Sequence, residues 1–466
     1  MDPRDQRIAE LEGQLRARDA VISELEEQIR QLQERLDGAK RAGKRQATPF
    51  ARKKRVVQPK RPGRKKGKGQ FASRPQPKPE EVAETKPEPL ACCPECAGEV
   101  IQRKEHEQFV VDIPPVKPVI TRYVTESGYC KTCQKRVRSR HPEQISDATG
   151  AAGVIIGPRA KALAADMKHR FGVSYGKICG LLEDAFGLQV TRGGWYQANV
   201  RLARRAKPVY AELVQVLRES TVVHADETGW RIGTLSAWLW VFTNRETTVY
   251  TIRRSRGHEV VLDILGTEFA GILNSDCFLA YDAKALNDWL KQKCVGHLLR
   301  NLSEIEASKT RGAVRFARNV TQLLRDALQL KAEKTNLPPA AFVERATTLE
   351  ERLDQLCHER RRFTDPDNAR FAKRLRKHRE HLLRFLYVDE LDATNNLAER
   401  QLRPAVITRK TTGCNRTDTG AETHAILSSV LTTCHQRSIP ILDFLTELQR
   451  ATSVLPLLGS PQPAPT

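Results

Sequence analysis

Residues 221–231 read TVVHADETGWR and place two acids, Asp226 and Glu227, directly after an apolar run. A carboxylate is costly to bury alone, so this pair belongs either to a polar turn at the end of a strand or to a site that binds something. TVVHAD predicts a strand, and the runs AWLWVFT and TTVYTI predict two more. A helical stretch, GHEVVLDILG, and a short buried strand, GILNS, follow.

This order of elements predicts a mixed sheet. Three strands in succession, then a helix and a strand, allow the last strand to lie parallel beside the first. In such sheets the carboxyl ends of neighbouring strands carry the site. GILNS leads to Asp276, so we expect Asp226 and Asp276 close together, each at the end of its strand. Taken singly, either residue is better explained as a turn residue or a helix cap.

A crowded pair of carboxylates favours a divalent cation. Each negative charge raises the pKa of its neighbour unless cations neutralise both. Mg²⁺ and Mn²⁺ prefer oxygen ligands, and paired ions serve phosphoryl transfer. A third acid is found in DATNNLAERQLRP, residues 392–404, where Asn396, Glu399, Arg400 and Arg403 share one face of a predicted helix. Spacing alone gives Glu399 little weight, because a Glu flanked by Arg is more often a surface ion-pair site.

Residues 311–391, between these parts, predict an inserted helical block. Its apolar residues recur at helical spacing, which is typical of a packed core and not of a chemical site. The residues expected in that core are Val320, Leu323, Leu324, Ala327, Phe342, Ala346, Leu349, Leu353 and Leu356.

Two helices are predicted before the sheet. SYGKICGLLEDAFG, residues 174–187, forms the first, which Gly187 should end, and Thr191 can cap the second, residues 192–205. The pair resembles a helix-turn-helix whose second helix, starting at Arg192, would enter a DNA groove. A packed helix pair without a DNA role remains the alternative.

Charge points to a polyanionic partner. The 466 residues carry a formal net charge of +22, and the segment from Lys40 to Lys68 has fourteen Lys or Arg and no acid. Such a segment cannot bury a core and would add salt-sensitive DNA affinity. A solvated spacer is the alternative. The expected DNA contacts here are Lys53, Lys54, Arg55, Lys60, Arg61, Arg64, Lys65 and Lys66.

Apolar residues near the N-terminus predict a coiled coil. Ile8, Leu11, Leu15, Ile22, Leu25, Ile29, Leu32 and Leu36 follow a three-four spacing. Ile at a and Leu at d favour a parallel two-stranded coil, so the chain is expected to self-associate. A solitary amphipathic helix is the alternative. An apolar signal core and a run of about eighteen apolar residues are both missing from the sequence, which predicts a cytoplasmic protein and no membrane partner.

Two CxxC pairs predict structural zinc. CPEC and CKTC supply four thiolates on two tight turns, which suits a tetrahedral ion. The spacer is longer than usual, but FVVDI and VITRYV within it read as strands that would bring the pairs together. Free thiols are the alternative, with Cys92 as an alternative ligand. The expected ligands are Cys93, Cys96, Cys130 and Cys133.

The order and spacing of several short motifs resemble those of transposases of insertion sequence 66 elements, members of the DDE class. Besides the zipper and the CxxC pairs, the motifs are KRPGRKKGKG, DIPPVKP, HADETGWR, WLWVFT, SDCFLAYD, CVGHLLRNL and NNLAERQLRPAVITRK. The resemblance implies a ribonuclease H-like domain interrupted by an insertion, with Asp226, Asp276 and Glu399 as a triad that binds two Mg²⁺ or Mn²⁺ ions. It thereby selects Asp226 over Glu227. Cys277 departs from the family, which usually has glycine there.

The resemblance also implies a reaction. The protein would bind the ends of its element, nick them by hydrolysis, and join the freed 3′-hydroxyls to target DNA, with no covalent protein intermediate. Arg400, Arg403, Arg409 and Lys410 are expected to hold phosphates, although they would serve equally as solvated charges. Cys294 and His297 match a family motif but cannot fill a zinc shell alone, so they are expected, with Arg300, to have a structural or DNA-contact role. Small accessory proteins and a place near the bacterial nucleoid are implied too.

The predicted architecture is therefore multidomain. It comprises a coiled coil (1–38), a basic and Pro-rich linker (39–90), a zinc-binding β domain (91–145), a helix-turn-helix region (155–215), an α/β catalytic domain (218–310 and 392–450) with an all-α insertion (311–391), and a tail (451–466). Two other functions share many of these features: a non-catalytic zinc-containing DNA-binding regulator and a structure-selective nuclease of the same fold. A regulator has no need of three acids on separate elements, and the large N-terminal half argues against the nuclease.

Overall fold

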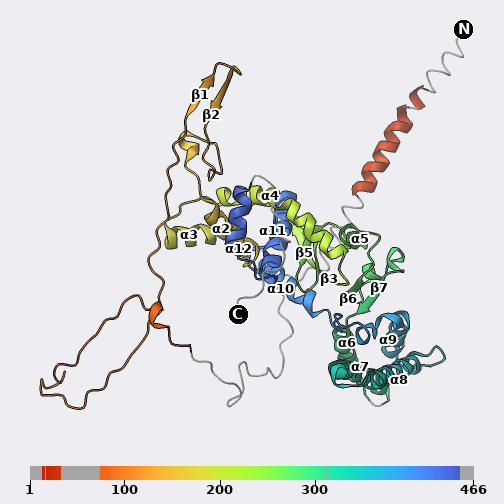
Figure 1. Ribbon diagram of the computed structural model, residues 1–466. Helices are drawn as coiled ribbons and strands as arrows, with labels where there is room; N and C mark the ends of the chain where they lie inside the picture. Colours follow the sequence, from red (N-terminus) through yellow and green to blue (C-terminus); the bar gives the residue numbers. More distant parts are fainter. Residues whose placement is uncertain (1–12, 16, 33–73, 311, 452–466) are drawn as a thin grey trace, which may run out of the picture.

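The structure is a computed structural model that describes residues 13–15, 17–32, 74–310 and 312–451 (Figure 1). The basic segment with its eight expected DNA contacts, most of the linker and the tail from residue 452 lie outside these ranges. Residues 17–32 are helical and expose Ile22, Leu25 and Ile29, so the described part of the expected N-terminal segment is a helix. Its self-association stays a prediction. Within the described residues, no helix is long and apolar enough to cross a membrane.

A five-stranded mixed sheet organises the centre of the molecule. Its strands are β3 (Val222–Ile232), β4 (Leu235–Thr243), β5 (Thr248–Arg253), β6 (Ile272–Ser275) and β7 (Leu290–Lys293), in the order β5-β4-β3-β6-β7. β3, β4 and β5 are antiparallel, whereas β6 lies parallel beside β3 and β7 parallel beside β6. The expected pairing of the last predicted strand with the first is confirmed.

Two strands differ from their prediction. β3 does not end near Asp226 but continues to Ile232, because Trp230 and Ile232 are buried and the whole segment pairs with β4. Asp226 therefore lies within a strand and not in a terminal turn. β7 was not predicted, since its sequence LKQK is mostly polar, yet Gln292 and Lys293 are fully buried in the sheet.

Helices cover both faces of the sheet. On one face, α4 (Arg192–Arg218) and α5 (Glu259–Leu265) pack with Val223 and Trp240 in one core, together with α11 (Asp418–Gln436) and α12 (Ile441–Arg450). On the other face, α10 (Asn396–Thr412) packs through Ala398 and Leu402 against Leu239 and Val241. Successive strand residues point to opposite faces, so even-numbered residues of β3 face α10 and odd-numbered ones face the main core.

The predicted helical insertion is present beyond the β7 side of the sheet (Figure 1). It contains α7 (Ala313–Glu333), α8 (Pro339–Cys357) and α9 (Pro366–Lys377), and α6 (Val295–Ser308) packs in the same core. All nine apolar residues expected in that core are buried there. The periodicity of these stripes was thus a reliable guide to packing.

The helices before the sheet also follow the sequence. They are α2 (Pro158–His169), α3 (Tyr175–Phe186) and α4. Gly187 ends α3 at a φ of 67°, and the Thr191 hydroxyl accepts a hydrogen bond from the Gly194 amide, as predicted. α4 continues to Arg218 and not to residue 205, because Ala206, Val209 and Leu213 bury its second half in the main core. A DNA role for this pair stays a prediction.

The cysteine-rich region contains one hairpin, β1 (Ser127–Cys130) with β2 (Lys135–Arg138). The strands expected at FVVDI and VITRYV are wrong: neither stretch pairs with a neighbour, and Val110, Val119 and Ile120 are exposed. Pro114, Pro115 and Pro118 in the same stretch lack the amide that a ladder needs. Residues that favour strands are not sufficient to form them here, because they have no buried face.

Candidate catalytic and metal-binding site

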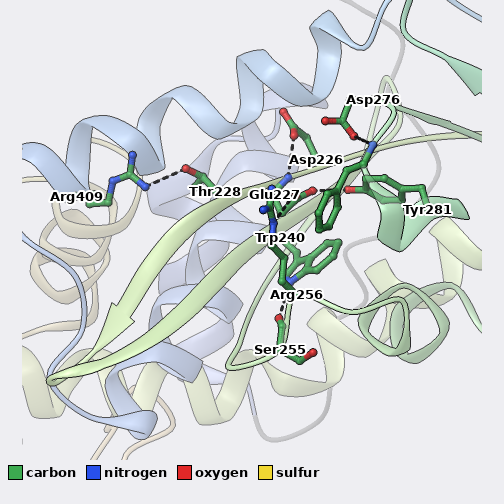
Figure 2. Close-up of polar contacts among 10 residues, drawn as sticks. Asp226, Glu227, Thr228, Trp240, Ser255, Arg256, Asp276, Tyr281 and Arg409 are labelled. Carbon is green, nitrogen blue, oxygen red and sulfur yellow. Dashed lines mark hydrogen bonds and ion pairs between the residues drawn. The ribbon is translucent and has the colours of Figure 1, made fainter. Parts of the chain in front are cut away.

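The parallel pairing of β3 and β6 places two acids side by side. Val222 pairs with Ile272 and His224 with Asn274, so continuing the register by two residues sets Asp226 level with Asp276. Asp276 directly follows β6, and Figure 2 shows its carboxylate beside that of Asp226. The Asp226 carboxylate accepts the Glu227 amide (2.9 Å), and the Asp276 carboxylate accepts the Phe278 amide (2.9 Å).

Glu399 approaches from α10, in the first helical turn. The start of this helix is held by Asn395, which is fully buried. Its side-chain amide donates to the Ala225 carbonyl (2.7 Å), next to Asp226, and its oxygen lies 3.2 Å from Nδ1 of His224. One side chain thus fixes the beginning of α10 against the strand that carries the first acid.

A second buried amide holds the segment before α10. Asn274, in β6, donates to the carbonyl oxygens of Asp392 (2.7 Å) and Thr394 (3.3 Å). The side chain of Asn274 is fully buried. Residues 392–395 are therefore tied to both parallel strands, which sets the position of Glu399 relative to Asp226 and Asp276.

The strand register separates the two acids of the opening motif. Asp226 pairs with Val241, on the α10 face, whereas Glu227 pairs with Trp240, on the face of the main core. Only Asp226 therefore shares a face with Glu399. Sequence reasoning without the family resemblance left this choice open, because either acid could have pointed either way.

The surroundings of Asp226 change its pKa. Burial, together with the negative charges of Glu227, Asp276 and Glu399, raises the pKa of Asp226 to about 7, although the Glu227 amide opposes the shift. A carboxyl with such a pKa needs a proton or a nearby cation at neutral pH. Three acids contributed by β3, the end of β6 and α10 thus form one negative cluster.

Glu227 has its own partners on the opposite face. Its side chain is 2% exposed and accepts hydrogen bonds from Arg256 (3.0 and 2.7 Å) and from the Tyr281 hydroxyl (2.8 Å; Figure 2). The Arg256 guanidinium lies between the rings of Trp238 and Phe278, 4.2 and 3.8 Å from their centroids. Phe278 and Tyr281 lie two and five residues after Asp276, so this cluster fastens the Asp276 loop to β3.

Lys293 supports the same loop from β7. Its side chain is fully buried, and Nζ donates to the Asp276 carbonyl (3.1 Å) and contacts Asp282 (2.9 Å). Burial would raise the pKa of Asp282, but the charge of Lys293 and the hydrogen bond from Lys377 hold that pKa below its usual value. The loop between Asp276 and Asp282 is consequently fixed at both ends.

Glu399 also has close neighbours on α6. The ligand atoms of Cys294, His297 and Glu399 all lie within 4.8 Å of one another, and Nδ1 of His297 is 3.6 Å from Oε1 of Glu399. In the described part of the chain, no other group of three Cys, His, Asp or Glu side chains meets this spacing. Asp226, Asp276 and Glu399 are therefore spread more widely than a single ion would require.

A comparison with known protein families identifies the family of this chain. The family described as Transposase IS66 family matches residues 153–423, which include β3, β6 and α10. The chain belongs to the IS66 transposase family. It is also 25% identical over 290 residues to an uncharacterized protein, y4qI, of Sinorhizobium fredii, a match that covers 56% of this chain and 53% of the relative. The chain thus spans about half the length of that curated relative.

The four zinc candidates of this IS66-family chain do not form one group. Cys93 begins a tight turn in which its carbonyl accepts a hydrogen bond from the Ala97 amide (2.8 Å). Cys130 ends β1, and Cys133 lies in the turn between β1 and β2. Backbone amides facing the sulfurs lower the pKa of Cys93 and that of Cys130. Each pair is thus arranged as a knuckle. Yet no three of the four sulfurs lie within 4.8 Å of one another.

Candidate DNA contacts of the described region are distributed over three helices, α4, α6 and α10. Arg192 is exposed at the start of α4, and Arg400, Arg403 and Lys410 are exposed on α10, while Arg300 is exposed on α6. Arg409 differs, because its guanidinium donates to the Thr228 hydroxyl (3.0 Å) and to the Gly229 carbonyl. It fastens α10 to β3, so its expected phosphate contact would compete with an existing structural one.

Several positioning residues of this family member were missed. Asn274, Asn395, Arg256 and Lys293 all hold a segment that carries one of the three acids. A usable signal existed for Asn274, which interrupts the apolar strand GILNS with a buried polar residue. Arg256 carried none, because its partner Glu227 lies 29 residues away along the chain.

Proposed function

We propose that this chain is a DDE-type DNA transposase whose catalytic acids are Asp226, Asp276 and Glu399. The observation that carries the proposal is their convergence from three elements: the first two are level on parallel strands, and the third shares the face of Asp226. Burial is the main cause of the raised pKa of Asp226, and the charges of Glu227, Asp276 and Glu399 add to it, which fits a position close to both other acids.

The sheet supports a ribonuclease H-like catalytic domain. Three antiparallel strands, β3 to β5, are followed by two strands parallel to the first, and α10 covers the face of Asp226. The helical insertion lies between β7 and α10 in the chain, so it separates Glu399 from the other two acids in sequence but not in space. This arrangement fits the interrupted domain that the family resemblance implies.

The donor set fits divalent cations. Three carboxylates offer only oxygen ligands, as Mg²⁺ and Mn²⁺ prefer, and their spread of more than 4.8 Å suits two ions better than one. When bound, the two ions would neutralise the acids and activate the attacking oxygen while stabilising the leaving one. Asp226 needs such neutralisation at neutral pH, because its pKa is raised to about 7.

The proposed reaction has two steps on DNA. In the first, a water oxygen bonds to the phosphorus at an element end, and the displaced oxygen leaves as a 3′-hydroxyl. In the second, that hydroxyl oxygen bonds to a target phosphorus and displaces a target 3′-hydroxyl. Neither step needs a nucleophilic side chain. Asn274, Asn395 and Arg256 serve both steps by holding the three acids in place.

Other parts of the chain would bind DNA and partners. Exposed Arg192, Arg400, Arg403 and Lys410 would contact phosphates, together with the basic segment. Zinc on Cys93, Cys96, Cys130 and Cys133 would join the two knuckles, each of which is already a tight turn. The N-terminal helix would pair two copies of the chain in parallel, and small accessory proteins of the element would complete the assembly.

The products of a single assay separate the transposase from its alternatives. Full-length protein would be incubated with labelled element-end DNA, target plasmid and Mn²⁺. We expect 3′-hydroxyl nicks at the ends and covalent joining to the plasmid. Binding without cutting would instead favour the DNA-binding regulator. Cutting of branched DNA without joining would favour the structure-selective nuclease.

A further inference from the structure

We propose that Cys294, His297 and Glu399 form a second metal site, for a thiophilic divalent ion such as Zn²⁺. The site is distinct from the pair of ions proposed above, because it uses the sulfur of Cys294, which directly precedes α6, and a ring nitrogen of His297 on α6. Its ligand atoms lie within 4.8 Å of one another. It shares one residue, Glu399, with the catalytic acids, and that sharing gives the site a function.

The His297 side chain points to a missing ligand. Its Nδ1 atom is buried without a hydrogen-bond partner and lies 3.6 Å from Oε1 of Glu399, too far for a hydrogen bond. A buried ring nitrogen left in this state loses the water contacts that it would otherwise make. Zinc-to-ligand bonds of about 2.0 to 2.3 Å would place the ligand atoms about 3.5 Å from one another. The three side chains, whose ligand atoms now lie within 4.8 Å of one another, would therefore have to move only slightly closer together.

The two helix starts that carry the ligands are fixed to the sheet. The Cys294 amide donates to the Ser275 carbonyl (2.9 Å), directly after which Asp276 leaves β6. The Cys294 sulfur accepts the Asn395 amide (3.1 Å), and Asn395 is itself held to Ala225. Because Cys294 and His297 are three residues apart, both face α10. The three ligands are consequently held together by the same contacts that position the catalytic elements.

The two sites would select different ions. Thiolate and imidazole ligands favour Zn²⁺ and Co²⁺, whereas sites of oxygen alone suit Mg²⁺ and Mn²⁺. Three protein ligands also leave a fourth position open for water or another group. The Cys294 site should therefore bind zinc at concentrations at which magnesium occupies only the carboxylates.

Sharing of Glu399 makes the second site inhibitory; this step rests on the proposed function. Glu399 cannot bind an ion beside His297 and complete the set of Asp226 and Asp276 with the same oxygen. Occupancy by zinc would thus withdraw the third acid and hold the transposase inactive. Loss of zinc would return Glu399 to the other acids.

Cobalt absorption tests the site without any use of activity. Co²⁺ would be added to full-length protein and to its Cys294→Ser variant, with Cys179→Ser, a half-buried cysteine on α3, as the matched control. Serine keeps an acceptor for the Asn395 amide, and circular dichroism would check the fold. We expect the Cys294→Ser variant to bind one Co²⁺ fewer per chain and to lose part of the thiolate-to-cobalt absorption, while Cys179→Ser matches the wild type.

Identical cobalt binding by all three proteins would overturn the site and leave Cys294 as a hydrogen-bond acceptor only.

A second experiment measures Zn²⁺ inhibition of Mn²⁺-dependent nicking. The rate of each protein with zinc is compared with its own rate without zinc. His297→Gln should raise the half-inhibitory Zn²⁺ concentration by about tenfold or more, since even residues outside the ligand shell change metal affinity this much. An unchanged value would refute the inhibitory role. If the wild type never nicks, the proposed function fails while the cobalt result still decides the metal site.

Discussion

The opposite orientations of Asp226 and Glu227 set their separate tasks. One residue apart on β3, they face α10 and the main core respectively. Asp226 has acid neighbours and no ion-pair partner in the described structure, whereas Glu227 is paired with Arg256. These contacts fit the proposal that Asp226 belongs to the catalytic site, whereas Glu227 holds the Asp276 loop.

Removal of Arg256 should expose that holding role. Arg256→Ala leaves the Glu227 carboxylate buried with Tyr281 alone, so we expect the free energy of unfolding to fall by about 3 kcal/mol, the lower end for breaking a buried pair. Arg256→Lys should cost less, because it keeps the charge but loses the two-nitrogen contact and the stacking. The matched control is Arg254→Ala, whose pair with Asp418 is exposed. Equal losses for Arg254→Ala and Arg256→Ala in urea unfolding would contradict this role.

The raised pKa of Asp226 predicts a pH-dependent stability without divalent ions. The folded value of about 7 lies above the unfolded value near 3.9, so the protonated acid favours the folded state at low pH. This stabilisation is lost between about pH 4 and pH 7, at up to about 1.4 kcal/mol per pH unit, and is absent above that range. Asp226→Asn should therefore raise the melting temperature at pH 8 but not at pH 4. If Asp226→Asn lowered the melting temperature equally at pH 4 and pH 8, the negative charge of Asp226 would not destabilise the folded state.

At the scale of elements, the start of α10 depends on one amide. Asn395→Ala removes its hydrogen bond to Ala225, so the first turn of α10 with Glu399 can shift against β3. A displacement of 1 Å at a catalytic group costs about 10²-fold in rate, which is the loss of kcat that we expect for end nicking. The affinity for end DNA should change little.

The neighbouring Asn396→Ala is the control for that change, because Asn396 is exposed at the first residue of the same helix. Its kcat should stay close to that of the wild type. If both variants lost only DNA affinity and kept kcat, Asn395 would be a DNA contact and not a positioning residue.

The spacing of apolar residues predicts most helices and strands, and contacts between segments that are distant in sequence explain the exceptions. The insertion helices, the end of α3 at Gly187 and the parallel pair of β3 and β6 follow from apolar spacing and cap residues. β7 could not be predicted from LKQK, because its burial depends on the Lys293 contact with Asp282 and on parallel pairing with β6. The strands expected between the cysteine pairs have β-forming residues but no partner strand. Local sequence cannot supply that partner.

At the scale of the whole molecule, the sequence and the family resemblance named three candidate acids but did not show how they lie in space. Asp276 and Glu399 are 123 residues apart in the numbering, and the insertion that separates them conceals their proximity. Glu399 was selected through the family resemblance, since its Arg neighbours suggested a surface ion pair. The third neighbour of Cys294 and His297 was equally hidden, because it comes from another helix.

The exposed seam of the N-terminal helix predicts that assembly depends on it. Ile22 and Leu25 are about half exposed on a single chain. The double substitution Ile22→Lys and Leu25→Lys keeps helix-forming residues but places charges in the seam, so light scattering should show a monomer where the wild type is at least a dimer. Ser23→Lys, outside the seam, should leave the mass unchanged. A wild-type monomer would contradict the coiled coil.

Asp226, Asp276 and Glu399 are proposed to act together in cutting DNA. The most direct measurement is the rate of Mn²⁺-dependent 3′-hydroxyl nicking at element-end DNA by the wild type, by Asp226→Asn, Asp276→Asn and Glu399→Gln, and by Glu268→Gln, an exposed acid outside the site. Each of the first three variants should lose at least about 10³-fold of the rate and still bind the DNA, since charge stabilisation is the largest catalytic contribution. Glu268→Gln should nick at the wild-type rate. Wild-type nicking by any one of the three would contradict the account.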